Sequence, residues 1–173
     1  MHELDEHQWR DLLQRLRRFA LWLTRNAASA DDLVQATIER ALTRRSQQHD
    51  PERLRPWLFT ILYRLFLDGK RRERLQARWL AWFARRDDDE PASSDDTERL
   101  VLAQADLQAF ARLPTQQRAL LLLVSVEGLS YKEAAEALAI PIGTVMSRLS
   151  RARAALRELT EGEPRPPALR RLK

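Results

Sequence analysis

Apolar residues recur at intervals of three and four along most of the chain, the spacing that lines one side of an α-helix. The spacing predicts one helix over residues 7–25, a second from near Ser29 and a longer third from Trp57 onward. It also predicts two helices between residues 100 and 126 and a helix pair within 130–156. No stretch alternates with the period of two that is typical of strands, and the chain has only 4 glycines. We therefore predict an all-α protein.

The helix pair within residues 130–156 has the most specific pattern. Ser130 and Glu133 form a capping box at its start, and Ala139-Ile140-Pro141 separates the two helices. The second helix buries an apolar stripe and presents a methionine, two serines and three arginines elsewhere: Met146, Ser147, Arg148, Ser150, Arg151 and Arg153. Such a pair is typical of a helix-turn-helix, whose second helix enters the DNA major groove. The alternative interpretation is a helical hairpin with a solvated basic face.

Charge divides the chain into three blocks. The 173 residues have a formal net charge of +5, distributed as +7 over residues 1–86, −7 over 87–98 and +5 over 99–173. The overall positive charge favours a polyanionic partner. The acidic block has no large apolar residue and cannot bury enough surface to fold. We predict two small helical domains, 1–86 and 99–160, the second containing the helix-turn-helix. An acidic flexible linker, 87–98, joins them, and a basic tail, 161–173, follows. The simplest interpretation of the linker is a solvated spacer.

The composition excludes several chemistries. The sequence has no cysteine, which excludes disulfides, zinc–cysteine sites and thiol catalysis. Its 3 histidines are too scattered for a metal site. Asp31 and Asp32 would project about 100° apart on a helix, so they do not form a catalytic pair. The acidic N-terminus does not resemble a signal peptide, and the apolar run Ala119–Val126 is too short to cross a bilayer. We expect a soluble cytoplasmic protein that is no enzyme and has no metal, cofactor or small-molecule substrate.

A second candidate nucleic-acid surface lies on the helix that begins at Trp57. The core side of this helix is apolar: Leu58, Ile61, Leu62 and Leu65. The opposite side combines an aromatic ring with polar and basic groups: Trp57, Thr60, Arg64, Asp68, Arg71 and Arg72. Aromatic rings beside arginines suit contact with unstacked bases and phosphates. An equally compatible interpretation places Trp57, Phe59 and Tyr63 in the core of a helical bundle. Farther along, one apolar patch is either core or a partner surface: Trp79, Leu80, Trp82 and Phe83.

Three segments, in this order, resemble those of the extracytoplasmic-function (ECF) sigma factors, group IV of the bacterial sigma factors related to the primary sigma. The segment that grips the clamp of the largest RNA polymerase subunit is similar to ASADDLVQATIERAL. The promoter-melting and minus-ten segment is similar to RPWLFTILYRLFLDGKRR. The domain that binds the flap of the second-largest subunit and reads the minus-thirty-five element is similar to LPTQQRALLLLVSVEGLSYKEAAEALAIPIGTVMSRLSRARAAL. The resemblance covers roughly residues 8–158.

The resemblance implies a role for each of three sets of residues. Polymerase binding is implied for Asp31, Asp32, Leu33, Gln35 and Arg40. Minus-ten recognition is implied for Arg53, Arg55, Trp57, Thr60, Arg64, Asp68, Lys70, Arg71 and Arg72. Minus-thirty-five recognition is implied for Thr144, Met146, Ser147, Arg148, Ser150, Arg151 and Arg153. The segment Asp50–Pro56, which we expect to be a loop between two prolines, lies where the family captures a flipped base. The acidic linker is implied to thread the polymerase channel that later holds RNA.

Two positions depart from the family pattern. The family often has Asn where this chain has Arg64, and Lys or Arg where it has Met146. Both departures imply a non-standard promoter preference.

The resemblance also implies the function and the partners. We expect an alternative sigma factor that does no chemistry itself, binds core RNA polymerase through its clamp and flap, and directs promoter-specific transcription initiation. Promoter DNA and an anti-sigma factor, either soluble or membrane-anchored, are the other implied partners. The alternative is a stand-alone helix-turn-helix transcriptional regulator whose first half is a dimerisation or sensor module.

Overall fold

The computed structural model describes residues 5–44, 50, 53–84 and 105–161. The described part of the first half forms three helices, α1 (Glu6–Thr24), α2 (Ala27–Thr43) and α3 (Leu54–Ala84). The described part of the second half forms α4 (Ala105–Arg112), α5 (Thr115–Leu121), the π-helical turn η3 (Leu122–Val126), α6 (Tyr131–Leu138) and α7 (Ile142–Glu161). These residues contain no strand, which confirms the prediction of an all-α protein. Within the same ranges, no helix combines the length and apolar character needed to span a bilayer.

The starts of α1 and α2 are fixed by capping side chains. The Asp5 carboxylate accepts a hydrogen bond from the backbone N–H of Gln8 at 2.7 Å, and the Gln8 side chain accepts one from the N–H of Asp5 at 3.0 Å. Asn26 caps α2 by accepting from the N–H of Ser29 at 2.8 Å. The helix therefore starts at Ala27, two residues before the expected start near Ser29. Asp31 and Asp32 lie in the second turn of α2.

The long helix α3 begins earlier than its apolar pattern predicts. It includes Leu54, Arg55 and Pro56, so the second part of the expected loop Asp50–Pro56 is helical. A proline is compatible with the first helical turn because the N–H groups there have no partner within the helix. The Pro56 carbonyl also accepts a hydrogen bond from the Thr60 hydroxyl, one helical turn later, at 2.9 Å.

The turn after η3 links the α5–η3 segment to the helix-turn-helix. The N–H of Glu127 donates to the Leu122 carbonyl at 2.8 Å, and that of Leu129 donates to the Leu123 carbonyl at 2.9 Å. Gly128 between them has a φ of +68°, a left-handed conformation that glycine adopts without steric cost. The turn therefore places the Glu127 side chain and backbone carbonyl at a defined position beside the first half of the chain.

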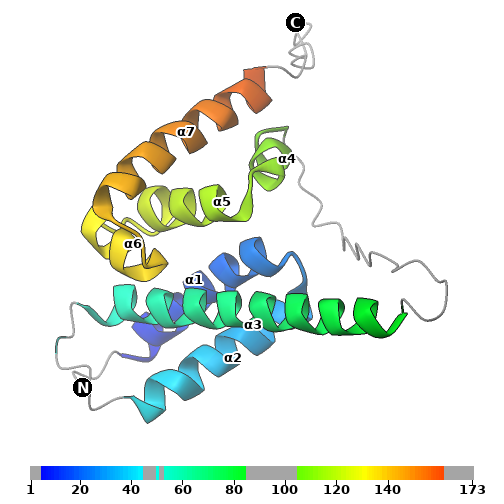
Figure 1. Ribbon diagram of the computed structural model, residues 1–173. Coiled ribbons are helices and arrows are strands. Elements are labelled where there is room, and N and C mark those ends of the chain that lie inside the picture. The colour runs from blue at the N-terminus through cyan, green and yellow to red at the C-terminus, as the bar shows by residue number, and fades with distance from the viewer. Residues whose placement is uncertain (1–4, 45–49, 51–52, 85–104, 162–173) are drawn as a thin grey trace, which may run out of the picture.

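The described parts of the two halves share one hydrophobic core (Figure 1). Phe19 of α1 meets Phe59 of α3 edge to face, with ring centroids 5.3 Å apart, and Leu120 and Leu123 belong to the same buried cluster. Helix α6 packs on α3, and α5 packs on α1. Phe59 and Tyr63 are buried, so for these two residues the core interpretation is correct. The domain boundaries stay a prediction, and residues 87–98 and 162–173 lie outside the described residues.

Candidate nucleic-acid and polymerase interfaces

Helices α6 and α7 form the predicted helix-turn-helix. The Ser130 hydroxyl accepts from the N–H of Glu133 at 3.2 Å, and the Glu133 carboxylate accepts from the N–H of Ser130 at 2.7 Å, which confirms the capping box. Helix α6 ends at Leu138, and Ala139 after it has a φ of +53°, which turns the chain toward α7. Hydrogen bonding to Ser130 lowers the pKa of Glu133 below its ordinary value, so the capping carboxylate is ionised at neutral pH.

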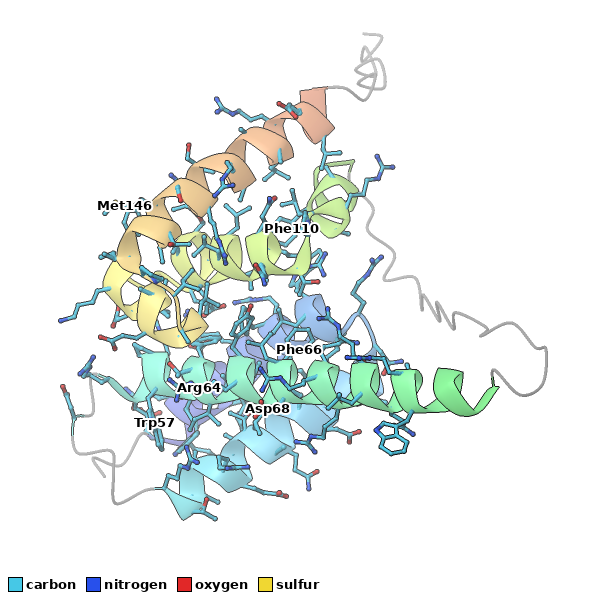
Figure 2. All side chains as sticks on the ribbon, viewed as in Figure 1. Trp57, Arg64, Phe66, Asp68, Phe110 and Met146 are labelled. Carbon is cyan, nitrogen blue, oxygen red and sulfur yellow. The ribbon has the colours of Figure 1, made fainter. Side chains whose placement is uncertain are left out.

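Helix α7 buries one side and exposes the other, as its sequence predicts. Its inner stripe, Val145, Leu149 and Ala152, is almost completely buried. On the outer side Met146 is 52% exposed, and Figure 2 shows it on the side of α7 turned away from the body of the protein. The other exposed members of the set are Ser147, Ser150, Arg151 and Arg153.

Two members of the minus-thirty-five set lie at the margin of the outer face. Thr144 and Arg148 are only half-exposed, and Arg148 donates to the Gln116 side chain of α5 at 3.1 Å. Arg148 therefore anchors α7 to α5. The outward surface available to a major groove consists of small polar side chains, one methionine and two arginines.

The predicted minus-ten residues are divided between two environments along α3. The members from Arg64 onward are exposed: Arg64, Asp68, Lys70, Arg71 and Arg72. Figure 2 shows Arg64 and Asp68 on this helix. Lys70 forms an exposed ion pair with Glu73 at 2.7 Å. Trp57 and Thr60 are half-buried, so an aromatic edge remains accessible near the start of the basic row.

Arg53 and Arg55 differ from the rest of this set because they contact the second half of the chain. Arg53 forms an ion pair with Glu136 of α6, with an N–O distance of 2.9 Å. The Arg55 guanidinium donates to the backbone carbonyl of Glu127. The structure therefore brings two predicted DNA-binding arginines into the joint between the halves.

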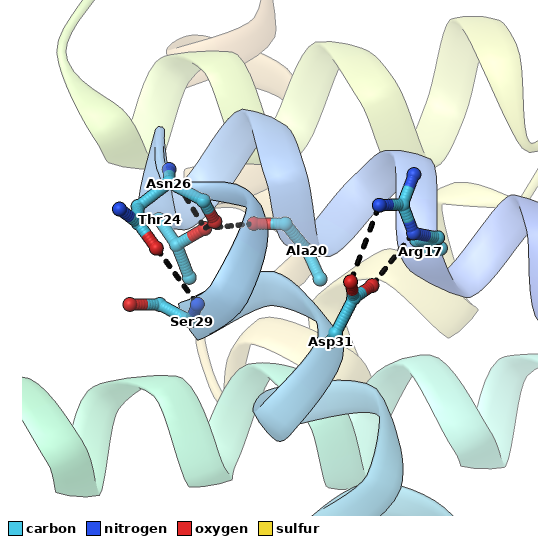
Figure 3. A network of polar contacts seen from close by, with 6 residues as sticks. All are labelled: Arg17, Ala20, Thr24, Asn26, Ser29 and Asp31. Atoms are coloured by element: carbon cyan, nitrogen blue, oxygen red, sulfur yellow. Dashed lines mark hydrogen bonds and ion pairs between the residues drawn. The ribbon is translucent and has the colours of Figure 1, made fainter. Parts of the chain in front are cut away.

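The predicted polymerase-binding residues lie on α2. The Asp31 carboxylate accepts two hydrogen bonds from Arg17 of α1, at 2.6 and 3.2 Å (Figure 3). These bonds lower the pKa of Asp31 and fix its side chain against α1. Gln35 donates to Glu39 at 2.9 Å along the exposed side of the helix. Asp32 and Arg40 are exposed, whereas Leu33 is half-buried.

A cavity of about 340 Å³ between α2 and α3 brings two predicted sets together. Its walls include Asp32 and Leu33 from the polymerase-binding set and Lys70 and Arg72 from the minus-ten set. The two surfaces are thus adjacent, and one binding event there can affect the other.

A larger cleft of about 800 Å³ lies between the two halves, and the sequence analysis did not single it out. It is lined by one tyrosine, several apolar side chains and seven cations: Arg25, Lys70, Arg71, Arg74, Arg78, Arg112 and Arg118. Among the residues that the structure describes, no acidic side chain lines it. Arg118 is 3% exposed and donates to the carbonyls of Trp22, Ala111 and Leu113 at 2.8–2.9 Å. Burial and the neighbouring Arg25 lower the pKa of Arg118.

Each half of the chain matches a known protein family. Residues 107–156 match the family described as Sigma-70, region 4, and residues 10–63 match the one described as Sigma2 domain of PhyR. Over 145 residues the chain is 37% identical to the ECF RNA polymerase sigma factor EcfG of Rhodopseudomonas palustris, an alignment that covers 83% of this chain and 78% of that protein. The chain belongs to the ECF sigma factor family.

Other ECF sigma factors show the same relationship. The chain is 36% identical over 160 residues to SigE of Mycolicibacterium smegmatis, covering 87% of this chain and 60% of that protein. Its structure is similar to that of the sigma factor RpoE of Bartonella quintana, which was solved in complex with the anti-sigma factor NepR. That match has a TM-score of 0.65 and 30% identity, and covers 92% of this chain and 98% of the other.

Proposed function

We propose that this ECF sigma factor acts as the promoter-specificity subunit of RNA polymerase and uses surfaces on α2, on α3 and on its second half. Helix α2 binds the clamp of the largest subunit with Asp31, Asp32, Leu33, Gln35 and Arg40. Helix α3 contacts and helps to melt the minus-ten element, and α7 reads the minus-thirty-five element. The second half also binds the flap of the second-largest subunit.

The observation that supports the proposal most strongly is the division of α7. Three residues of its inner stripe are buried in the shared core, while Met146, Ser147, Ser150 and Arg151 face outward. A helix held in this way can enter a major groove without losing its packing. The exposed basic row on α3 supplies a second nucleic-acid surface. A stand-alone regulator needs the first surface only.

We also propose where the protein acts in the cell and which partner restrains it. It acts in the cytoplasm, does no chemistry itself and needs no cofactor. An anti-sigma factor restrains it until an inducing signal arrives. This partner is suggested by the NepR-bound state of the similar sigma factor from Bartonella quintana. Trp79, which is 62% exposed at the far end of α3, adds an apolar surface that such a partner can cover.

The test of the sigma function is reconstitution with core RNA polymerase. The protein should co-purify with core enzyme, and the complex should give discrete run-off transcripts on a subset of genomic fragments. Core enzyme alone and core enzyme with the Arg151→Ala variant are the controls. A protein that stays separate from core enzyme, or yields no transcript above core enzyme alone, would refute the proposal.

The anti-sigma partner is tested separately by affinity capture from cells before and after stress. A regulatory protein of anti-sigma type should accompany the sigma factor before induction, and core polymerase should replace it afterwards. Recovery of polymerase alone under both conditions would count against sequestration.

A further inference from the structure

The cations of the 800 Å³ basic cleft come from two opposing walls. One wall is α3, whose cations follow one another over about two helical turns: Lys70, Arg71, Arg74 and Arg78. At about 1.5 Å of rise per residue, this row extends over about 12 Å. The other wall is built by the ends of α1 and α4 and by α5, which supply Arg25, Arg112 and Arg118. A compact ligand in the cleft would therefore meet positive charge from two directions.

Most of this positive charge on α3 is not neutralised by the protein. Lys70 pairs with Glu73 at 2.7 Å. In the part of the chain that the structure describes, Arg71, Arg74 and Arg78 form no ion pair. A cleft lined by charges of one sign focuses the electrostatic field and concentrates counter-ions. The basic cleft therefore attracts anions more strongly than the same arginines would if they were scattered over the surface.

Arg118 adds a buried charge without a counter-charge. Its Nε donates to the Trp22 carbonyl, and its Nη1 donates to the carbonyls of Ala111 and Leu113. All three acceptors are neutral, and Nη2 makes no hydrogen bond to the described residues. Burial and the neighbouring Arg25 lower the pKa of Arg118. Because a buried charge is costly unless it is paired, an anion in the cleft would compensate a charge that the described chain leaves uncompensated.

The size and composition of the cleft indicate the class of anion. A volume of about 800 Å³ lies within the range of about 300–1,000 Å³ that is usual for small-molecule sites. Six of the seven cations are arginines, whose planar fork matches the geometry of phosphate oxygens. A row about 12 Å long is longer than a single phosphate requires. Leu67 and Leu75, 40% and 48% exposed, add apolar surface to which a nucleoside can bind.

We propose that the basic cleft is a binding site for a small anion made of several linked phosphates, either inorganic or carried by a nucleoside. Arg74 and Arg78 bind the phosphates from α3, and Arg25 binds them from the opposite wall. A long nucleic-acid strand is a poorer fit, because its phosphates would follow one wall and leave the other unneutralised.

The site gives the ligand a regulatory effect. Lys70 and Arg71 line the cleft and also belong to the minus-ten set. A phosphate chain bound there would compete with DNA for these two cations, so it should weaken minus-ten binding. This effect rests on the proposed function, whereas binding of the ligand rests on the cleft alone.

The first experiment titrates the full chain with three anions and follows the heat of binding. Tripolyphosphate and ATP share three linked phosphates and differ in the nucleoside, and citrate carries three carboxylates and no phosphate. All titrations use neutral pH, matched ionic strength and no magnesium. Tripolyphosphate and ATP should each bind at one site, and citrate should bind at least about tenfold more weakly, because phosphates present more oxygens and more charge to the arginine forks.

The variant that tests the cleft is Arg74→Gln/Arg78→Gln. Both arginines are exposed, and neither belongs to the three sets of predicted site residues. The matched control, Arg10→Gln/Arg44→Gln, also removes two exposed arginines from the first half, but neither of these lines the cleft. The cleft variant should bind tripolyphosphate at least about tenfold more weakly, because it loses charge-assisted hydrogen bonds. The control should stay within about twofold of wild type, and circular dichroism checks that both variants are folded.

The second experiment measures competition with DNA. A fluorescent single-stranded oligonucleotide carries the minus-ten sequence obtained from run-off transcription, and its anisotropy reports binding to the full chain. Tripolyphosphate should displace the oligonucleotide from wild type and from the control variant at concentrations near its own dissociation constant. Displacement from Arg74→Gln/Arg78→Gln should require at least about tenfold more tripolyphosphate.

The proposal is overturned if neither phosphate compound binds, if citrate binds equally well, or if both variants lose affinity equally. An oligonucleotide that loses as much affinity as tripolyphosphate in Arg74→Gln/Arg78→Gln also overturns it, and assigns the cleft to nucleic acid. Equal binding of ATP and tripolyphosphate supports a site for the phosphate chain alone, and tighter binding of ATP supports a site that also holds the nucleoside. Binding without displacement supports the site and overturns the assignment of Lys70 and Arg71 to the minus-ten element.

Discussion

Arg151 is the residue of α7 best suited to read a base. It is exposed, one helical turn beyond Ser147, and its Nε donates to the Ser147 carbonyl at 3.3 Å, which leaves the end of the guanidinium fork toward solvent. An arginine fork can bind guanine O6 and N7 together. Arg151→Ala should therefore cost about 1–3 kcal/mol on the preferred minus-thirty-five element and flatten the preference at one base pair. Transcription of a promoter library measures both effects.

Arg72 provides the comparison for this prediction. It lies in an exposed basic row on α3, a setting that favours phosphate contacts, which carry no sequence information directly. Arg72→Ala should weaken holoenzyme binding similarly on all promoters and reduce the salt slope by about one. If Arg151→Ala also weakens all sequences equally, its side chain contacts the DNA backbone and the base-reading assignment is wrong.

Asp31 makes a prediction about pH. Hydrogen bonding to Arg17 depresses the pKa of this carboxyl in the folded protein. The pair therefore contributes its full stabilisation above the unfolded pKa of about 3.9, and this contribution is lost as the pH falls through the folded value. Carboxyl NMR should show Asp31 titrating below the ordinary aspartate range. In Arg17→Ala the pKa should return toward that range, and an unchanged pKa would show that the pair is absent in solution.

At the scale of elements, the capping box of α6 determines where the helix-turn-helix begins. Ser130 and Glu133 satisfy each other's backbone N–H groups and share a further bond between the Ser130 hydroxyl and the Glu133 carboxylate at 2.7 Å. Ser130→Ala should cost about 1 kcal/mol of stability and raise the pKa of Glu133 toward its ordinary value. Urea unfolding and carboxyl NMR provide the two measurements.

A serine on a helix surface is the control for this prediction. Ser29 of α2 is exposed, and its side chain makes no capping bond. Ser29→Ala should leave the urea midpoint nearly unchanged. Equal losses from both substitutions would mean that serine-to-alanine change in general, and not the capping box, lowers the stability.

The elements differ in how well local sequence predicts them. The capping box and the buried stripe of α7 were predictable because both depend on residues within one or two turns. The start of α2 was missed because Asn26, a strong N-cap residue, precedes the first apolar position of the helix. The start of α3 was missed because prolines were interpreted as loop residues, although a first helical turn accepts them.

The contacts between the halves were beyond sequence reasoning for a different reason. Arg118 directly precedes an apolar run, and its partner outside its own segment is the Trp22 carbonyl, 96 residues away. Glu127 has no local partner for its carboxylate either, and meets Arg18 across 109 residues. Periodicity shows which face of a helix is buried, but it does not show which charged residue of a distant helix will lie there. The basic cleft and the Glu127 turn are therefore visible only in the folded chain.

At the scale of the whole molecule, the candidate DNA-binding surfaces differ in how accessible they are while the two halves are packed together. The outer face of α7 is open, whereas Arg53 and Arg55 of the minus-ten set are engaged by the second half. The cavity between α2 and α3 joins the polymerase-binding and minus-ten sets. In the proposed function, polymerase would therefore bind at α2 beside the helix proposed to contact DNA, and this proximity would couple the two events.

This arrangement predicts that promoter specificity depends on core polymerase. The free protein has net charges of +7 and +5 on the blocks that flank its acidic segment, so it should bind duplex DNA through phosphates, weakly and with a steep salt dependence. Its preference for one DNA sequence should be small because Arg53 and Arg55, on the predicted minus-ten surface, are bonded to the second half of the chain. Addition of core polymerase should increase the preference for a promoter over a scrambled duplex by at least about tenfold, since a single mismatched base pair typically costs 1–3 kcal/mol.

Competition binding at two salt concentrations, with and without core enzyme, measures this ratio of affinities. Tight, salt-resistant and sequence-specific binding by the isolated protein would contradict the prediction, because a sigma factor whose DNA contacts depend on polymerase would not behave in that way.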